Sequence, residues 1–241
     1  MIPILKNSET AAARDLFALQ DTAYRAFHAK LVPTLDAERI IGVRTPALRA
    51  YAAQCAAKWT DGEKRAFYAA VPHYYYEENN LHAFLLARQR VPGDVPFDRA
   101  MSAVDAFLPY IDNWATCDMF APKFFAAYPA RVLPFVRRWL ASGRTYTVRF
   151  AVVTLLQFFL DENFTPEIPE LAASCPAGDY YADMAVAWFF STALVKRYDS
   201  ALPYLTERRL SVWVHNKTIQ KAVESRCVSA ETKTYLRSLK I

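Results

Sequence analysis

The placement of proline constrains the fold of this chain more than any other feature of its sequence. The 241 residues include 14 prolines but only five glycines. Prolines mark the short breaks between apolar segments that have helical periodicity. No segment alternates convincingly between apolar and polar residues, as a half-buried strand would. The sequence therefore predicts an all-α protein.

The expected helices follow from this pattern of breaks. Thr45 is expected as an N-cap, because Pro46 would then occupy the first helical position, where its missing N–H costs nothing. We expect helices over residues 10–31, 46–58, 63–71, 74–90, 97–110, 114–127, 130–142, 147–160, 168–174, 180–197, 200–205 and 216–226.

Notable residues recur on every second expected helix. Asn79, Trp114, Arg149 and Trp188 are separated by 35, 35 and 39 positions. Two-helix solenoid repeats of the HEAT type have periods of this size, and their inner helices line one concave face. We therefore expect one HEAT-like domain over residues 1–241, a right-handed superhelix of antiparallel helix pairs with a concave DNA-binding groove.

Several other classes lack their usual sequence signals. The chain contains no GxGxxG or P-loop spacing, which removes the signal for a nucleotide cofactor. Its four cysteines stand singly, without a CxxC pair: Cys55, Cys117, Cys175 and Cys227. Residues 1–19 carry charges within their apolar pattern and lack the apolar core of a signal peptide, and the apolar runs near 150–160 and 184–195 are too short to span a membrane. We expect a cytoplasmic protein.

Positive charge is concentrated in the second half of the chain. Residues 1–120 hold 13 Lys and Arg against 14 Asp and Glu, whereas residues 121–241 hold 16 against 10. A basic half favours a polyanionic partner, with nucleic acid as the first hypothesis. A basic surface that serves only solubility is the alternative.

The segment Ile111-Asp112-Asn113-Trp114-Ala115-Thr116-Cys117-Asp118 contains the strongest functional signal. Residues four apart on a helix lie one turn apart on the same face, so Trp114 and Asp118 are expected to project together. A carboxylate on an apolar helix must be paired, hydrogen-bonded, solvated or used in chemistry, because burying it alone costs several kcal/mol. The alternative is a structural Asp beside a core Trp.

Arg149 and Trp188 stand on the next two inner helices of the expected repeat. Arg149 begins an otherwise apolar segment, where its guanidinium must find an anion: a DNA phosphate or a carboxylate such as Asp118. Trp188 alone would more often be a core residue. A carboxylate with two indoles and an arginine would suit a cationic sugar, because glycosidic cleavage passes through an oxocarbenium-like state that carboxylates and aromatic faces stabilise.

A set of motifs completes this pattern: Gly42-Val43-Arg44-Thr45-Pro46-Ala47-Leu48-Arg49, Glu77-Glu78, Ile111-Asp112-Asn113-Trp114 with Asp118, Tyr146-Thr147-Val148-Arg149-Phe150, Ala187-Trp188, and His215-Asn216-Lys217 through Ile219-Gln220-Lys221 to Glu224-Ser225. With them the chain resembles the AlkD-like DNA alkylation repair proteins, which are HEAT-repeat DNA glycosylases, along nearly its whole length.

The resemblance implies an enzyme that excises N3- and N7-alkylated purines, such as 3-methyladenine and 7-methylguanine, from duplex DNA in base excision repair. It implies no metal and no cofactor. We expect a monomer. By the same resemblance, Asp118 is the catalytic residue, Trp114 and Trp188 are the two cradle tryptophans that contact DNA, and Arg149 contacts a phosphate.

The chain departs from the family pattern at two places. The family's best-known members carry a basic residue one turn beyond the second cradle tryptophan, where this chain has Ser191. The N-terminal tyrosine that reaches DNA has no clean match, although Tyr24 and Phe27 lie in the corresponding segment. These departures bear on DNA affinity and lesion range.

Two other functions remain open from the sequence. A non-catalytic HEAT-repeat adaptor that binds DNA or protein would account for the repeat and the basic half, but not for Asp118. A metal hydrolase is a weaker alternative, and Glu77-Glu78 is expected to be solvated or capping. The histidines show no metal-ligand spacing: His28, His73, His82 and His215.

Overall fold

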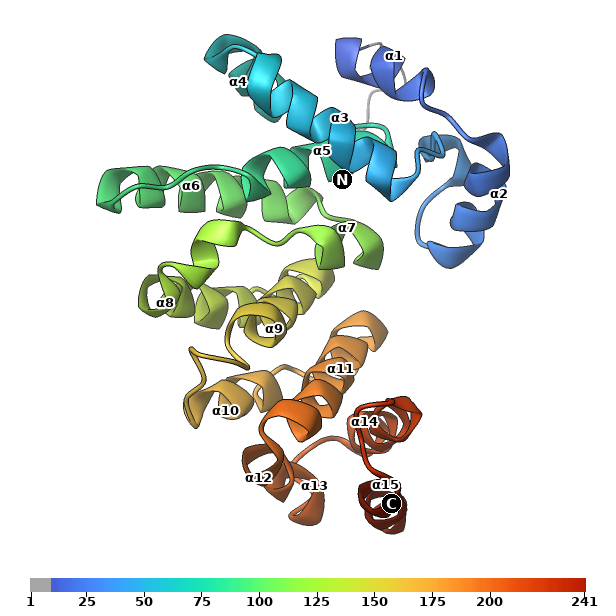
Figure 1. Cartoon of the computed structure of the whole chain (residues 1–241), viewed down its shortest axis with the longest axis vertical. Coiled ribbons are helices and arrows are strands. Elements are labelled where there is room, and N and C mark those ends of the chain that lie inside the picture. The colour runs from blue at the N-terminus through green and yellow to red at the C-terminus, as the bar shows by residue number, and fades with distance from the viewer. Residues whose placement is uncertain (1–9) are drawn as a thin grey trace. The chain divides into compact units, whose positions relative to one another are not determined.

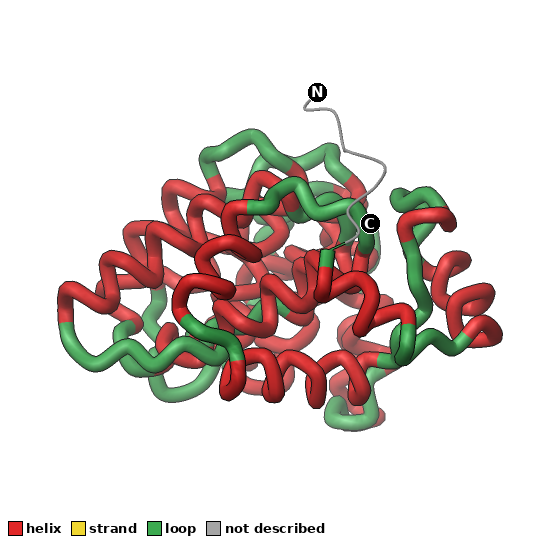
Figure 2. Tube along the Cα trace, turned by 90° about the horizontal axis from the view of Figure 1, so that it is seen from above, coloured by secondary structure: helices red, strands yellow, loops and turns green. Residues whose placement is uncertain are grey.

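The computed structural model describes residues 10–241, apart from the side chain of Asp94, and every regular element within them is a helix (Figures 1 and 2). Residues 1–9, part of the segment expected to lack a signal peptide, lie outside the described part. The α-helices are α1 (Ala11–Phe17), α2 (Thr22–Leu31), α3 (Thr45–Lys58), α4 (Asp61–Ala69), α5 (Tyr76–Ala87), α6 (Asp94–Phe107), α7 (Trp114–Met119), α8 (Pro129–Leu140), α9 (Thr145–Phe158), α10 (Glu167–Ala173), α11 (Tyr180–Lys196), α12 (Tyr198–Ala201), α13 (Pro203–Thr206), α14 (Val212–Glu224) and α15 (Ala230–Ser238). The 3-10 turns are η1 (Ala37–Arg39), η2 (Leu108–Tyr110) and η3 (Lys123–Ala126). The all-α prediction is confirmed.

The helices form two compact units, residues 1–124 and 125–241. In the first unit, α5 packs against both α3 and α7. In the second, α11 packs against both α9 and α14, while α8 lies against α9. Asn79, Trp114, Arg149 and Trp188 fall on α5, α7, α9 and α11, and packing joins α5 to α7 in the first unit and α9 to α11 in the second.

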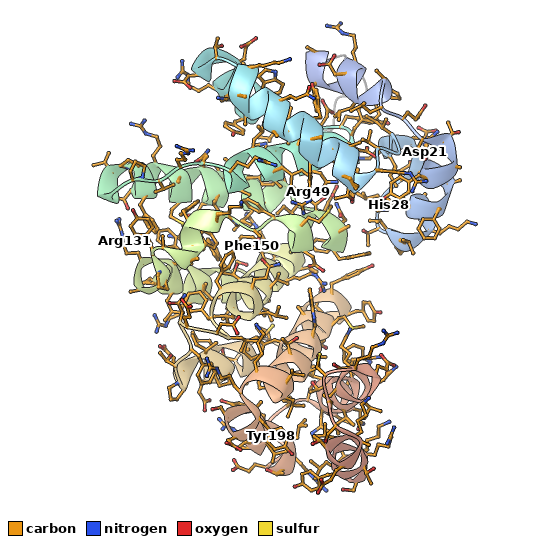
Figure 3. The ribbon with its side chains drawn as sticks, viewed as in Figure 1. Asp21, His28, Arg49, Arg131, Phe150 and Tyr198 are labelled. Carbon is orange, nitrogen blue, oxygen red and sulfur yellow. The ribbon has the colours of Figure 1, made fainter. Side chains whose placement is uncertain are left out.

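Each unit has its own apolar core. In the first, α5 is buried along almost its whole length, and Leu81 and Phe84 pack beneath Leu48 and Ala52 of α3. In the second, Phe150 of α9 is fully buried and meets the ring of Trp139 from α8 at 5.1 Å between centroids (Figure 3). Within the described residues, no helix is long and apolar enough to cross a membrane.

The first expected helix, residues 10–31, is in fact two helices. Asp21 interrupts it: its carboxylate caps α2 by accepting the backbone N–H of Tyr24 at 2.8 Å, and its own N–H donates to the Gly42 carbonyl at 2.9 Å (Figure 3). A side-chain cap and a long-range hydrogen bond therefore override a continuous helical pattern.

Other boundaries also differ from expectation. The helix expected over 114–127 ends at Met119, because Pro122 follows and disfavours helical geometry at the residue before it. Thr45 is not an N-cap but the first residue of α3, whose N-cap is Arg44. Helix α15 was not expected, and α14 begins at Val212 instead of 216, because the Ser211 hydroxyl caps it.

Candidate functional site

Asn113 sets the start of α7. Its side-chain oxygen accepts the backbone N–H of Thr116 at 2.8 Å, and its amide donates to the Thr116 hydroxyl at 2.9 Å. Asn113 and Thr116 are fully buried. Because both side chains are held by these bonds inside the protein, the first turn of α7 has a fixed orientation.

The indole of Trp114 is held at one edge. Its Nε1–H donates to the Leu31 carbonyl at the end of α2, at 3.0 Å, and the ring packs against the apolar cluster that includes Val32 and Tyr76. The side chain nevertheless stays partly exposed. The hydrogen bond and the packing fix the plane of the ring before any ligand arrives, which lowers the conformational entropy lost on binding.

Asp112 ties the same segment to the turn after α2. Its carboxylate forms an ion pair with Arg39 at 2.8 Å and accepts the Asn113 amide at 3.0 Å. Arg39 also donates from Nε to the Tyr74 carbonyl at 3.0 Å. The first aspartate of the motif therefore has a structural role, and its partner Arg39 is distant from it in the sequence.

Asp118 lies one turn after Trp114 on α7, as the spacing predicts. Asp118 and Trp114 are both partly exposed, whereas Ala115, Thr116 and Cys117 between them are buried. The helix thus buries one side and leaves Trp114 and Asp118 partly exposed on the other. This pair is the part of the expected site that one short helix assembles by itself.

Trp188 lies on the partly exposed stripe of α11 in the second unit. Met184, Trp188 and Thr192 follow each other at helical spacing along this stripe, while Ala187 and Phe189 beside Trp188 are buried. Trp188 is therefore not a fully buried core residue. Ser191, which stands where the family has a basic residue, is 7% exposed and donates its hydroxyl to the Trp188 carbonyl at 2.9 Å.

Arg149 is buried near the start of α9, with 5% of its surface exposed. Its guanidinium donates to the Tyr181 carbonyl in the first turn of α11, at 2.7 Å. Arg149 therefore links α9 to the helix that carries Trp188. This contact is a structural role that sequence reasoning did not include.

Four aromatic rings cross the N-terminal ends of α9, α11 and α14, and we call them the aromatic row: Tyr146, Tyr181, Tyr180 and Trp213. Successive centroids lie 5.4, 5.2 and 5.7 Å apart. Tyr180 is 58% and Trp213 40% exposed. The ammonium of Lys217 lies 5.6 Å from the centre of the Trp213 ring.

The aromatic row lies in the more basic unit, where residues 125–241 contain 15 Lys and Arg against 10 Asp and Glu. Sequence reasoning missed it, because Tyr180 and Trp213 are 33 positions apart and only tertiary packing brings them together. Exposed aromatic rings beside cations suit contact with a nucleic-acid strand.

The Gly42 motif and Glu77 form a buried turn with a structural role. The Glu77 carboxylate is fully buried and accepts three backbone N–H groups, from Ile41, Gly42 and Val43, at 2.9, 2.7 and 3.2 Å. Gly42 has φ +97°, and a Cβ there would lie 2.5 Å from that of Arg25. Only glycine fits this turn, because both the backbone angle and the space exclude a side chain.

Glu78 is also buried, but it caps its own helix. Its carboxylate accepts the Tyr75 backbone N–H at 3.1 Å and the Thr10 hydroxyl at 2.6 Å. The expectation that Glu78 caps a helix is confirmed. The expectation that these glutamates are solvated is wrong for both, because both are buried. Glu77 is buried because its ligands are the N–H groups of a distant turn, which the sequence could not place beside it.

His215 and Asn216 tie α14 to the segment after α15. The imidazole Nε2 of His215 is 2.8 Å from the Leu239 carbonyl, and Asn216 exchanges hydrogen bonds with the backbone of Ile241. His215 is fully buried. This motif therefore serves the packing of the last helices.

The fold and these surfaces define an all-helical protein in which alternate helices pack side by side and present partly exposed indoles. Residues 13–223 match the family model described as DNA alkylation repair enzyme, so the chain belongs to this family of DNA alkylation repair enzymes. No curated protein matches the chain. The family inferred from the sequence motifs is confirmed, and membership supports a role in the repair of alkylated DNA.

Proposed function

We propose that this protein is a DNA glycosylase that removes positively charged N3- and N7-alkylated purines, such as 3-methyladenine and 7-methylguanine, from duplex DNA. One observation carries the proposal: a member of the DNA alkylation repair family presents Asp118 one turn from a pinned, partly exposed Trp114. A surface that only bound phosphates would avoid a carboxylate beside its aromatic contact, because the negative charge opposes binding.

The chemistry needs little beyond this pair. An N3- or N7-alkylated purine carries a formal positive charge and leaves as a neutral base, so no general acid is required. The carboxylate of Asp118 would stabilise the oxocarbenium-like sugar and orient the attacking water. A charge pair about 4 Å apart at an effective dielectric near 20 is worth roughly 4 kcal/mol, or about a thousandfold in rate.

The proposed architecture is a HEAT-like solenoid of one domain. The inner helices would be α3, α5 and α7 in the first unit and α9, α11 and α14 in the second, with the DNA along their common face. The side-by-side packing of these helices within each unit supports this arrangement. In such a cradle the DNA backbone is gripped while the lesion needs no enclosing pocket.

DNA binding is assigned to the partly exposed residues of these helices. Trp114 and Trp188 would contact the strand that carries the lesion, and the aromatic row with Lys217 would contact the neighbouring backbone. Arg149 is proposed as a phosphate contact from the family resemblance, alongside its structural bond to Tyr181.

The N-terminal aromatic contact is assigned to Phe27 in preference to Tyr24. Phe27 is 58% exposed on α2. Tyr24 instead lies under the guanidinium of Arg44, 5.0 Å from its ring centre, and stacks on His28 at 5.3 Å. Phe27 therefore offers more exposed ring surface to a ligand than Tyr24, which is only partly exposed.

The direct test is base release by the wild-type protein. Duplex DNA treated with a methylating agent is incubated with the protein, and the released bases are identified by mass spectrometry, with unmethylated DNA as the control. We expect release of 7-methylguanine or 3-methyladenine from the methylated duplex alone. Tight DNA binding without any release would instead establish the adaptor function.

A further inference from the structure

The first unit contains a basic cleft that the proposed excision does not use. It has a volume of about 770 Å³ and lies among the C-terminal ends of α3 and α5, helix α4 and the start of α6. Its basic residues come from α4, the connection after α5 and α6: Lys64, Arg65, Arg88, Arg90 and Arg99.

The charge of this cleft opposes that of the unit around it. Five basic residues line it, against Asp61 as the one acidic residue among the described lining residues. Residues 1–120 as a whole carry slightly more acidic than basic residues. The cleft is therefore a local concentration of positive charge and not part of a generally basic surface.

The described acidic side chains near the cleft are not paired with its exposed arginines. In the described part of the chain, Arg65, Arg90 and Arg99 form no ion pair with a carboxylate. Glu63, beside Lys64 in the sequence, is used in the capping box of α4, where its carboxylate accepts the Thr60 hydroxyl and N–H, each at 2.7 Å.

Two cations are held by backbone carbonyls instead. The Lys64 ammonium donates to the Ala56 carbonyl at 2.9 Å, and Arg88 approaches the Arg49 carbonyl at 3.5 Å. A carbonyl positions a cation without cancelling its charge. The cleft therefore keeps a positive potential that a bound anion would neutralise.

The inner wall of the cleft is apolar. Leu85 and Ala100 are buried there, whereas Tyr68 and Pro96 are partly exposed. Apolar walls with convergent polar groups are typical of small-molecule sites, whose volumes fall between about 300 and 1,000 Å³. An anion that fits this cleft would carry a flat or apolar group as well as negative charge.

We propose that the cleft binds a nucleotide, with its phosphates on the arginines and its base against the wall formed by Tyr68 and Leu85. Guanidinium groups suit phosphate oxygens because they offer several N–H donors in one plane. The same chemistry is available from a free nucleoside polyphosphate or from a nucleotide within a single strand, and the experiment below separates the two sources.

This cleft is distinct from the Trp114 site. Tyr76, at the first residue of α5, packs in the same cluster as Trp114, whereas Leu85 and Arg88 lie at the other end of α5. Twelve residues of helix extend for about 18 Å. In Figure 1, α4 and one end of α6 lie on the left of the first unit, and α7 and α2 lie on the right.

The test compares two matched pairs of charge reversals in the full-length protein. Arg65→Glu with Arg99→Glu changes the cleft. Arg14→Glu with Arg237→Glu makes the same change in net charge at exposed positions outside it. Binding of a fluorescent ATP derivative and of a labelled single strand of about ten nucleotides is measured by fluorescence anisotropy.

We expect the cleft pair to weaken binding of at least one probe by about tenfold or more, and the control pair to weaken it by less than about threefold. Inorganic triphosphate should displace the probe, whereas adenosine, which lacks phosphate, should not. Loss of ATP binding identifies a free nucleotide as the ligand. Loss of strand binding alone identifies a nucleotide within a strand.

Equal weakening by the two pairs, or no binding of either probe to the wild type, would overturn the proposal. Circular dichroism checks that the variants are folded, and Arg65→Gln with Arg99→Gln, which removes charge without reversing it, should give an intermediate loss. Asp118→Asn should leave binding at the cleft unchanged. The proposed excision and the proposed nucleotide site can therefore be refuted independently of each other.

Discussion

Asp112 and Asp118 are identical side chains on one motif that lie in different surroundings. Asp112 pairs with Arg39 and the Asn113 amide, so its carboxylate holds the segment in place. Asp118 is partly exposed on the same face as Trp114. Helical spacing was sufficient to predict that Asp118 lies beside Trp114. The partner of Asp112, Arg39, is 73 positions away and could not be predicted.

The buried histidines His73 and His82 are expected to make the protein sensitive to acid. Their ring nitrogens lie 2.9 Å apart, and the rings stack on Phe67 and Phe107. Burial lowers the pKa of His73 to about 4 and holds the pKa of His82 well below its usual value. Both imidazoles are therefore neutral in the native protein near neutral pH.

The unfolded chain binds protons at these histidines near pH 6.5, well before the native state does, so the free energy of unfolding decreases as pH falls toward 4. Between pH 7 and pH 5, His73 alone accounts for about 2 kcal/mol. Urea denaturation of the wild type at both pH values should show this loss, and the variant with His73→Phe and His82→Phe should lose correspondingly less. An identical pH dependence in the two proteins would refute this account.

Arg149→Ala tests whether a buried arginine also contacts DNA. We expect DNA affinity to fall about tenfold and excision to slow, because a guanidinium that can pair with phosphate is lost. Stability should fall by about 1–3 kcal/mol, because the Tyr181 carbonyl loses its donor. Anisotropy titration and urea denaturation measure the two effects. A stability loss above about 3 kcal/mol with unaltered DNA affinity would make the role of Arg149 structural alone.

At the scale of helices, most elements could be predicted from the sequence, and the errors have local physical causes. The expected helix over 10–31 failed because Asp21 bonds to Gly42, a contact that periodicity does not encode. The expected helix over 114–127 ends early, at Met119, because Pro122 disfavours helical geometry at the residue before it. The pair of Trp114 and Asp118 could be predicted because a single helical turn joins them.

The aromatic row depends on the packing of three helices, α9, α11 and α14. Trp213→Ala and Tyr180→Ala are each expected to weaken binding to duplex DNA about five- to tenfold, since exposed aromatic contacts are worth roughly 1 kcal/mol or more. Tyr235→Ala is the matched control, because Tyr235 is 43% exposed on α15 and lies outside the row. Equal affinities for the three variants in anisotropy titrations would remove the row from the DNA interface.

At the scale of the whole molecule, charge is the property that the sequence describes best. Residues 121–241 have a net charge of +6, from 16 basic and 10 acidic residues. Sequence reasoning could locate this charge in the second half, but not the local basic cleft in the first, because its arginines come from separate segments that folding brings together.

DNA binding is therefore expected to depend strongly on salt. Binding to DNA releases cations that were condensed on the phosphates, and this release is less favourable at high salt. A protein that makes about six phosphate contacts therefore loses roughly a thousandfold in affinity between 50 and 200 mM salt. Titrations of a labelled duplex over this range give the slope directly. A dissociation constant that does not change with salt would contradict an electrostatic interface.

The central claim is that Asp118 stabilises the cationic sugar, and Asp118→Asn tests it most directly, because the substitution keeps the shape of the side chain and removes its charge. The measurement is single-turnover release of 7-methylguanine, alongside a DNA-binding titration. Glu38→Gln, an equivalent change at an exposed residue of η1, is the control. We predict that Asp118→Asn slows release by about two to three orders of magnitude without weakening binding, because the carboxylate stabilises the transition state and not the bound DNA. Equal rates for the wild type and Asp118→Asn would contradict the mechanism.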